Sequence, residues 1–174
     1  MRKIIFTLLM LCVFGVNAQE TEKIMRHEIK INALYTLIGI PEIGYEYILN
    51  KESSIGIDLL FSGEEDINLK FALTPHYRFY FGKKPAAGFF TEIFGMINSS
   101  KEEQHYYSDI APGQGIYYSN KTHTDVALGF ALGSKIITDK GWIFEIYGGL
   151  GRNLLNNDSN DFVPRGGLSI GKRF

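Results

Sequence analysis

The feature that most constrains the fold of this chain is a period-two alternation of apolar and polar residues, which recurs from residue 27 onward. Successive side chains of a β-strand point to opposite faces, so this alternation predicts amphipathic strands. One face of each segment carries mostly Ile, Leu, Phe and Tyr, and the other carries charged residues, amides and glycine. The fifth segment is less regular, because Phe90, Phe94 and Met96 fall on its polar face. The alternating segments are 28–37, 42–50, 54–62, 67–81, 88–98, 125–136, 142–151 and 165–174.

An even number of amphipathic strands is compatible with two architectures, which differ in the face that points inward. A soluble barrel or sandwich turns its apolar face inward, whereas an outer-membrane barrel presents this face to lipid and lines its interior with polar residues. The apolar faces here carry more bulk than eight closely packed strands enclose. Glycine concentrates on the polar faces, as expected where charged side chains share a narrow lumen.

The lengths of the connections also favour the membrane architecture. Three turns are short and two connections are longer, as is typical of periplasmic turns and external loops, although one external connection, at 39–41, is minimal. The short turns lie at 50–53, 82–87 and 138–141, and the longer connections lie at 98–122 and 153–162. We therefore predict one all-β domain over residues 27–174, an eight-stranded antiparallel transmembrane up-and-down β-barrel. A secreted soluble lipocalin-like barrel that binds a ligand is the alternative.

The N-terminal residues predict export from the cytoplasm. Two basic residues precede an apolar stretch over 4–16, which is followed by a small residue, Ala18, before Gln19. This order of regions is typical of a Sec-type signal peptide. We predict that residues 1–18 are removed near Ala18-Gln19 and that residues 19–26 form a periplasmic N-terminal segment. The mature protein is then expected in the cell outer membrane.

Composition excludes several other classes of protein. The chain carries 18 basic and 19 acidic side chains, a net charge of -1, and no basic stripe that would hold nucleic acid. Beyond the N-terminal stretch, no apolar run approaches the roughly 20 residues of a transmembrane helix. The only cysteine, Cys12, lies in the predicted signal peptide, and no phosphate loop or cluster of metal ligands is present. Neither disulfides nor a cofactor is therefore expected.

Charged residues on the polar faces are nearly balanced in sign, and a barrel would bring them together in its lumen. Unpaired buried charges are costly, so we expect these groups to pair across the lumen. Because eight strands leave room only for side chains, we predict a closed, salt-bridged lumen that conducts nothing. The alternative is a narrow ion path or a proton-linked site. The predicted lumen residues are Glu28, Lys30, Glu46, Asp58, Lys70, His76, Arg78, Glu92, Asp125, Lys135, Glu145, Arg165 and Arg173.

The long connection over residues 98–121 is the best candidate for a binding surface. Its candidate residues are His105, Tyr106, Tyr107, Tyr117 and Tyr118. Tyrosine offers a large amphipathic contact area at low entropic cost, which suits recognition of an extracellular protein or glycan. Alternatively, these tyrosines extend the flanking strands above the membrane or belong to its aromatic belt.

Two stretches carry a resemblance to a known family. Residues 41–47, Pro-Glu-Ile-Gly-Tyr-Glu-Tyr, and residues 73–82, Leu-Thr-Pro-His-Tyr-Arg-Phe-Tyr-Phe-Gly, are similar to a Bacteroidota-type family of small outer-membrane β-barrels without assigned function. The resemblance covers the whole mature chain. It implies that the barrel contacts outer-membrane lipid and lipopolysaccharide. Phe174 resembles the terminal signal by which the barrel-assembly machinery recognises its clients. We expect the barrel to be a monomer.

The alternative to a structural or binding role is an enzyme built on the same barrel. Some small barrels of this type modify lipid A with a histidine, a serine and a carboxylate near the outer rim. Here His123 and Asp125 would share a face, but Thr124 points away from His123 and a His-x-Ser pair on one face is missing. Because nucleophile, base and orienting group are not all placed, we expect no catalysis; a lipid A acyl hydrolase or transferase remains the alternative.

Overall fold

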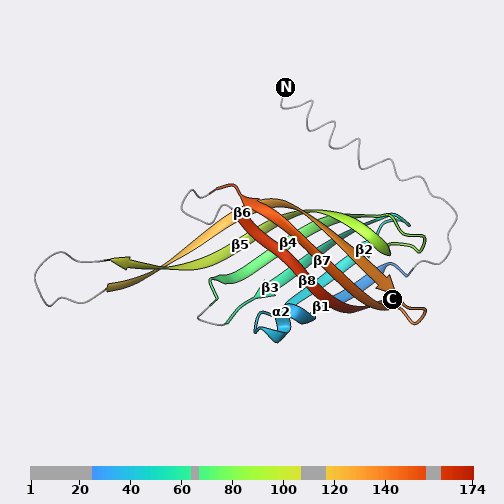
Figure 1. Ribbon diagram of the computed structural model, residues 1–174, viewed down its shortest axis with the longest axis horizontal. Helices are drawn as coiled ribbons and strands as arrows, with labels where there is room; N and C mark the ends of the chain where they lie inside the picture. Colours follow the sequence, from blue (N-terminus) through green and yellow to red (C-terminus); the bar gives the residue numbers. More distant parts are fainter. Residues whose placement is uncertain (1–24, 64–66, 107–116, 156–161) are drawn as a thin grey trace, which may run out of the picture.

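The computed structural model describes residues 25–63, 67–106, 117–155 and 162–174, which form a closed barrel of eight antiparallel strands (Figure 1). Each strand pairs with the next one in the chain, and the last strand returns to pair with the first. The predicted all-β, eight-stranded up-and-down barrel is therefore confirmed. Its elements are β1 (His27–Asn32), α2 (Ala33–Leu37), β2 (Glu42–Ile48), β3 (Ser53–Phe61), β4 (Leu69–Tyr80), β5 (Gly88–Tyr106), β6 (Tyr117–Ile137), β7 (Trp142–Asn153) and β8 (Phe162–Arg173).

Apolar side chains point out of the barrel, and polar side chains point into it. Exposed and buried residues alternate along β8, as the period-two pattern requires. On the outer face Ile93 is 65% exposed and Ile136 is 64% exposed, whereas Glu46 and Glu92 inside are each 0% exposed. The polar faces recognised in the sequence therefore line the lumen.

The first strand is shorter than the sequence predicts. The alternation predicts a strand through residue 37, but Ala33–Leu37 forms the short helix α2. Asn32 caps this helix, because its side chain accepts a hydrogen bond from the Tyr35 backbone N–H, and Thr36 Oγ1 donates to the Asn32 carbonyl oxygen at 2.7 Å. Asparagine favours this capping geometry, and periodicity does not report it. The prediction of a strand over 33–37 is therefore wrong. The prediction of a minimal connection at 39–41 is also wrong, because the connection between β1 and β2 covers 33–41.

The connections at the two ends of the barrel differ in length. At the end where β1 begins, the turns are 49–52, 81–87 and 138–141. At the other end, the connections are 33–41, 62–68, 107–116 and 154–161. Each of the second group is at least as long as any of the first. The sequence predicts one short connection, 39–41, among these longer ones. The helix α2 extends this connection to 33–41, so it is no longer an exception.

The β5–β6 hairpin projects well beyond the rest of the wall (Figure 1). β5 continues to Tyr106, which pairs with Tyr117 at the beginning of β6, so the predicted loop is wrong over 98–106 and 117–122. Pairing with β4 reaches only Ser100, and pairing with β7 reaches only Ala127. The outer part of the hairpin therefore consists of two strands, whose backbone groups pair with each other. Tyrosines, which favour strands, flank its tip in the sequence.

Glycines on the lumen face make room for larger side chains. A Cβ atom on Gly56 would collide with the imidazole of His76, and one on Gly133 would collide with the ring of Phe90. Phe90 falls on the polar face in the sequence, and it accordingly points into the lumen with 0% exposure. The concentration of glycine on the polar faces thus reflects close packing inside a narrow barrel.

Two groups of apolar side chains lie inside the barrel. Ile48 and Ala86 place the first group near the short turns, and Ile40 and Leu60 place the second near the opposite end. The first group is Ile48, Tyr80, Ala86, Phe90 and Tyr147. The second group is Ile40, Leu60, Ala72, Phe94, Met96, Ala127, Ala131 and Val163. Apolar packing therefore fills the lumen toward both of its ends.

Candidate functional site

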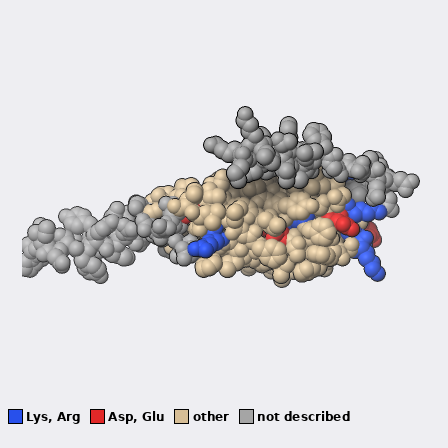
Figure 2. Space-filling view, turned by 90° about the horizontal axis from the view of Figure 1, so that it is seen from above, with Lys and Arg blue, Asp and Glu red and all other residues tan. Residues whose placement is uncertain are grey.

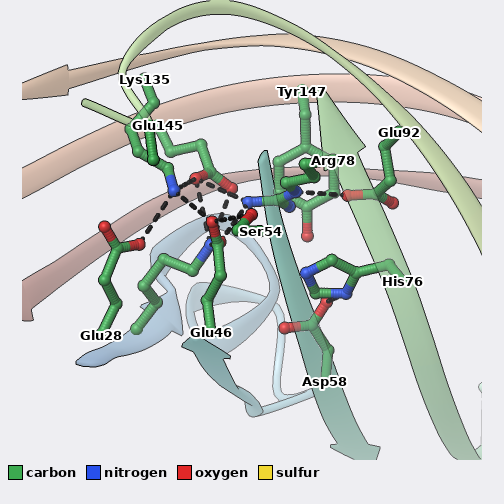
Figure 3. Close-up of polar contacts among 12 residues, drawn as sticks. Glu28, Glu46, Ser54, Asp58, His76, Arg78, Glu92, Lys135, Glu145 and Tyr147 are labelled. Atoms are coloured by element: carbon green, nitrogen blue, oxygen red, sulfur yellow. Dashed lines mark hydrogen bonds and ion pairs between the residues drawn. The ribbon is translucent and has the colours of Figure 1, made fainter. Parts of the chain in front are cut away.

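Glu46, on β2, is the centre of the polar contacts in the lumen (Figure 3). Its Oε2 atom accepts hydrogen bonds from Lys30 Nζ at 2.6 Å and Arg78 Nη1 at 2.8 Å. Its Oε1 atom accepts a hydrogen bond from Lys135 Nζ at 2.7 Å. The hydroxyl donors to Oε1 are Ser54 Oγ and Tyr80 OH, each at 2.6 Å. These donors take the place of the water that a carboxylate binds in solution.

Glu145, on β7, shares the same three cations. Its Oε2 atom lies 3.1 Å from Lys30 Nζ, 2.9 Å from Arg78 Nη1 and 3.7 Å from Lys135 Nζ. Each of these cations therefore contacts both Glu46 and Glu145. Five different strands, β1, β2, β4, β6 and β7, supply the five residues, so the contacts join the barrel wall across its interior.

Arg173 and Glu28 extend the network to the end with the short turns. Glu28 Oε2 lies 2.8 Å from Lys135 Nζ, and Glu28 Oε1 lies 2.6 Å from Arg173 Nη2. The guanidinium of Arg173 also donates to the carbonyl oxygens of Pro85 at 2.7 Å and Ala86 at 2.8 Å. The turn 81–87 is thereby tied to the side chains that fill this end of the lumen.

A second arm of the network runs from Arg78 to His76. Glu92 accepts a hydrogen bond from Arg78 Nε at 2.7 Å and another from Arg165 Nε at 2.6 Å. Arg165 Nη2 also pairs with Asp58, whose Oδ2 atom lies 3.2 Å from His76 Nδ1. Among the described residues, His76 Nε2 has no hydrogen-bond partner. The arm therefore ends on an imidazole that is packed against the backbone of β3.

Aromatic rings enclose the guanidinium groups of the network. The Arg78 guanidinium lies 4.5 Å from the centre of the Phe90 ring. The Arg165 guanidinium lies 5.2 Å from the ring centres of both Phe94 and Tyr147. Cations at this distance from a ring centre are attracted by the ring quadrupole. The rings therefore give the cations a favourable contact on faces where no carboxylate lies.

Among the described residues, the ion pairs of this network join five cations to five carboxylates, and the buried Glu42 is held by hydrogen bonds instead. The cations are Lys30, Arg78, Lys135, Arg165 and Arg173. The carboxylates are Glu28, Glu46, Asp58, Glu92 and Glu145. All ten residues are buried. Removing an ion from water costs several kcal/mol, so this filling of the lumen depends on each charge keeping its partners.

Two of the lumen residues expected from the sequence differ from the rest. Lys70 is only half-buried, near the beginning of β4. Asp125 is buried, and its Oδ1 atom accepts hydrogen bonds from the backbone N–H groups of Val126 at 2.7 Å and Leu155 at 3.0 Å. Asp125 therefore holds the chain just beyond β7, where the connection 154–161 begins.

Several polar residues of the lumen lie outside the charge network that the sequence predicts. Asn32 Nδ2 donates to Glu42 Oε1 at 3.0 Å, and Tyr147 OH donates to the same oxygen at 2.8 Å. The hydroxyls of Ser54 and Tyr80 complete the coordination described above. Each of these residues has the same parity as the charged lumen residues of its own strand. Strict parity, rather than charge, is therefore the signal that identifies them.

His123 and Asp125 share the lumen face of β6, at 8% and 1% exposure, whereas Thr124 is exposed. The register places Ser100 directly opposite His123 and Asn98 opposite Asp125. Side chains of directly opposite residues share a face of the sheet. Within the described part of the chain, His123 Nε2 has no hydrogen-bond partner. Ser100 on β5 is thus the cross-strand neighbour of His123 on β6. The spacing of the two residues in the sequence does not reveal this.

The residues predicted to bind from the long loop lie in or beside the projecting hairpin. The ladder pairs His105 with Tyr118 and Tyr106 with Tyr117. Tyr107 lies outside the described residues. The backbone register therefore supports the alternative in which these residues extend the flanking strands.

The described ranges hold neither a cluster of metal ligands nor a helix suited to a membrane. No three histidine, cysteine, aspartate or glutamate side chains in these ranges gather as metal ligands. None of the helices in the described ranges has the length and apolar content that a membrane-spanning helix needs.

No curated protein and no solved structure matches this chain. A family described as "Protein of unknown function (DUF3575)" matches residues 4–165. This match takes in β1 to β7 and the beginning of β8. It therefore includes most of the strands that supply the lumen network. The chain belongs to the DUF3575 family of proteins of unknown function.

Proposed function

We propose that this protein is an integral outer-membrane β-barrel, closed to passage through its lumen, with a structural or surface-binding role. The observation that carries the proposal is the apolar outer face of the barrel. Every strand contributes large exposed apolar side chains to this face. Examples from β1 to β8 in order are Ile31, Ile43, Ile55, Phe79, Ile93, Ile136, Ile146 and Ile170.

Such a face is unfavourable in water and favourable in lipid. Monomeric soluble proteins rarely expose contiguous apolar patches above a few hundred Å². Each large apolar side chain gains about 1.5–3 kcal/mol when it leaves water. In Figure 2 most of the visible wall lacks Lys, Arg, Asp and Glu, which gather chiefly at the end with the short turns. A soluble ligand-binding barrel requires the opposite arrangement, with its apolar face inside.

Aromatic side chains near the short turns support the same placement. Phe174 stacks on His27 with ring centres 5.8 Å apart, and Phe81 packs against Phe89 at the same distance. Trp142, at the beginning of β7, is 48% exposed on the outer face. Rings of aromatic residues at the membrane–water interfaces are typical of outer-membrane barrels. We place the periplasmic interface at this end.

The filled lumen favours a structural or binding role over transport. Buried, matched ion pairs occupy its middle, and apolar clusters pack toward its ends. Eight-stranded barrels have an interior just wide enough for side chains. The surface-binding element is the β5–β6 hairpin, which projects from the end opposite the short turns (Figure 1). Its proposed ligand is an extracellular protein or a glycan.

Export and assembly complete the proposal. Residues 1–18 direct the chain to the periplasm as a signal peptide, and the barrel-assembly machinery then inserts it into the outer membrane as a monomer. Fractionation of cells tests this, together with gel mobility before and after heating. We expect the protein in carbonate-resistant outer membranes, with faster migration before boiling. A carbonate-soluble protein whose mobility does not change on heating would contradict the proposal.

A second candidate function is hydrolysis of an acyl ester of lipid A at the outer rim. The observation in its favour is the neighbourhood of Ser100, His123 and Asp125 on the lumen face of β5 and β6. A serine beside a histidine with an unoccupied ring nitrogen is the arrangement that nucleophilic catalysis uses. Mass spectra of lipid A from strains with the wild-type protein and with H123A test this. Spectra that are identical with and without the protein would remove the candidate.

A further inference from the structure

The barrel wall has an irregular seam between β1 and β8. β8 pairs with β7 along its whole length, from Arg152 opposite Phe162 to Trp142 opposite Lys172. Its pairing with β1 ends at Asn32 opposite Ser169, where the chain turns into α2. Over residues 164–168 the β1 side of β8 therefore lies beside the helix α2 instead of a strand.

Part of the backbone edge left open at this seam has a side-chain partner. His27 and Phe174 exchange backbone hydrogen bonds. Every second residue of an antiparallel strand faces the same neighbour, so the backbone polar groups of residues 164, 166 and 168 also point toward the β1 side. Asn32 Nδ2 donates to the Gly166 carbonyl oxygen at 3.3 Å, and Tyr35 lies beside Gly166 in the same groove lining. Pro164 has no N–H group to satisfy. Unpaired backbone groups are costly in hydrocarbon, and these two features reduce their number at the seam.

A groove of about 460 Å³ follows this seam. Its lining includes three outward-facing apolar side chains, Leu34 of α2, Ile146 of β7 and Leu168 of β8. Tyr147 and Arg165, whose side chains belong to the lumen network, also line it. Its volume is in the range of small-molecule sites, which are about 300–1,000 Å³. The groove is therefore an open, mainly apolar depression at this seam, where the other seams are closed by strand pairing.

We propose that this groove holds one acyl chain of a membrane lipid. The inference rests on the proposed membrane location, because Ile146 and Leu168 continue the apolar outer face formed by Phe144 and Ile170. A chain from the surrounding lipid thus meets the groove directly. The polar side chains in its lining are already paired, since Tyr147 OH donates to Glu42 and Arg165 donates to Glu92. The groove therefore recognises the hydrocarbon chain rather than the head group.

Lipid retention by the full-length protein tests the proposal. Protein reconstituted in phosphatidylcholine nanodiscs is released into a mass spectrometer, and the lipid that stays bound is counted. We expect the wild-type barrel to retain one phosphatidylcholine. L168W and L34W fill the groove from its two walls, and each is expected to lower the retained fraction at least ten-fold. Added palmitate, which has the chain without the head group, is expected to displace the phosphatidylcholine.

Matched variants separate groove filling from a general effect of tryptophan. Ile170 lies two residues from Leu168 on the same outer face, and Leu37 is the most exposed apolar residue of α2. Neither lines the groove, so I170W and L37W are expected to retain lipid as the wild type does. Equal retention by L168W and the wild type, or no retained lipid on an inserted wild-type barrel, would overturn the groove alone. A wild-type protein that does not insert would overturn the membrane proposal as well.

Discussion

Lys135 reaches across the lumen from β6 to Glu46 on β2, and its Nζ atom lies 2.7 Å from Glu46 Oε1. In the closed order of eight strands these two lie on opposite sides of the barrel. The same ammonium group contacts Glu28 on β1 at 2.8 Å. The ion pairs therefore brace the wall from within, as apolar packing does in a soluble protein.

The first prediction concerns this brace. E46Q keeps the shape of the side chain but leaves Lys30, Arg78 and Lys135 with less negative charge. Breaking a buried ion pair by removing one partner typically costs about 3–5 kcal/mol, so we expect the free energy of unfolding in lipid vesicles to fall by this amount. Urea titration followed by gel mobility measures it. E52Q makes the same change on an exposed turn residue, and an equal effect of both variants would contradict the role assigned to Glu46.

The second prediction concerns space inside the lumen. G56A places a methyl group against the His76 imidazole and the Tyr45 carbonyl oxygen, so the wall or the imidazole must shift. Overpacking of this kind costs about 1–3 kcal/mol, which we expect as a loss of unfolding free energy. A methyl group on Gly148 would meet nothing within 4 Å beyond its chain neighbours, so G148A serves as the control and is expected to be neutral. A neutral G56A would contradict close packing around His76.

These contacts show which parts of the structure could be predicted from the sequence. Parity alone places Glu46, Arg78 and Lys135 in one lumen, because a strand has a fixed period of two. Parity does not say which of these charges meet, since that depends on the register between strands far apart in the chain. It also misses α2, where the Asn32 side chain offers the backbone a local hydrogen bond that competes with the strand.

The position of Ser100 opposite His123 could not be predicted from the sequence, for a related reason. The two residues are joined only by the β5–β6 register, which runs beyond the alternating segments into polar sequence. In that sequence neither face carries the apolar signal that marks a strand. The same lack of contrast explains why the sequence predicts a loop over residues 98–106.

The third prediction tests the solvent around the wall. Ile93 lies in the middle part of β5 that pairs on both sides, and its side chain is 65% exposed. In lipid, I93R is expected to cost about 2–4 kcal/mol, the range for an arginine facing the bilayer midplane. Phe81 begins the short turn 81–87, near the proposed interface, so F81R is expected to cost only about 0–1 kcal/mol. Urea unfolding in vesicles gives both values, and an I93R barrel as stable as F81R would argue against lipid at this depth.

The last prediction separates the projecting hairpin from the barrel. Residues 102–121 are replaced by an Asn-Gly turn that joins Lys101 to Thr122, which are paired in the ladder. The removed strands contact neither β4 nor β7 through pairing, and an isolated two-stranded ribbon is marginally stable, so the unfolding free energy is expected to change by no more than about 1 kcal/mol. Heat-modifiable mobility is expected to remain, whereas capture on a glycan array by cells that display the protein is lost. Failure of the shortened protein to insert would make the hairpin part of the folding unit, and unchanged glycan capture would place binding elsewhere on the barrel.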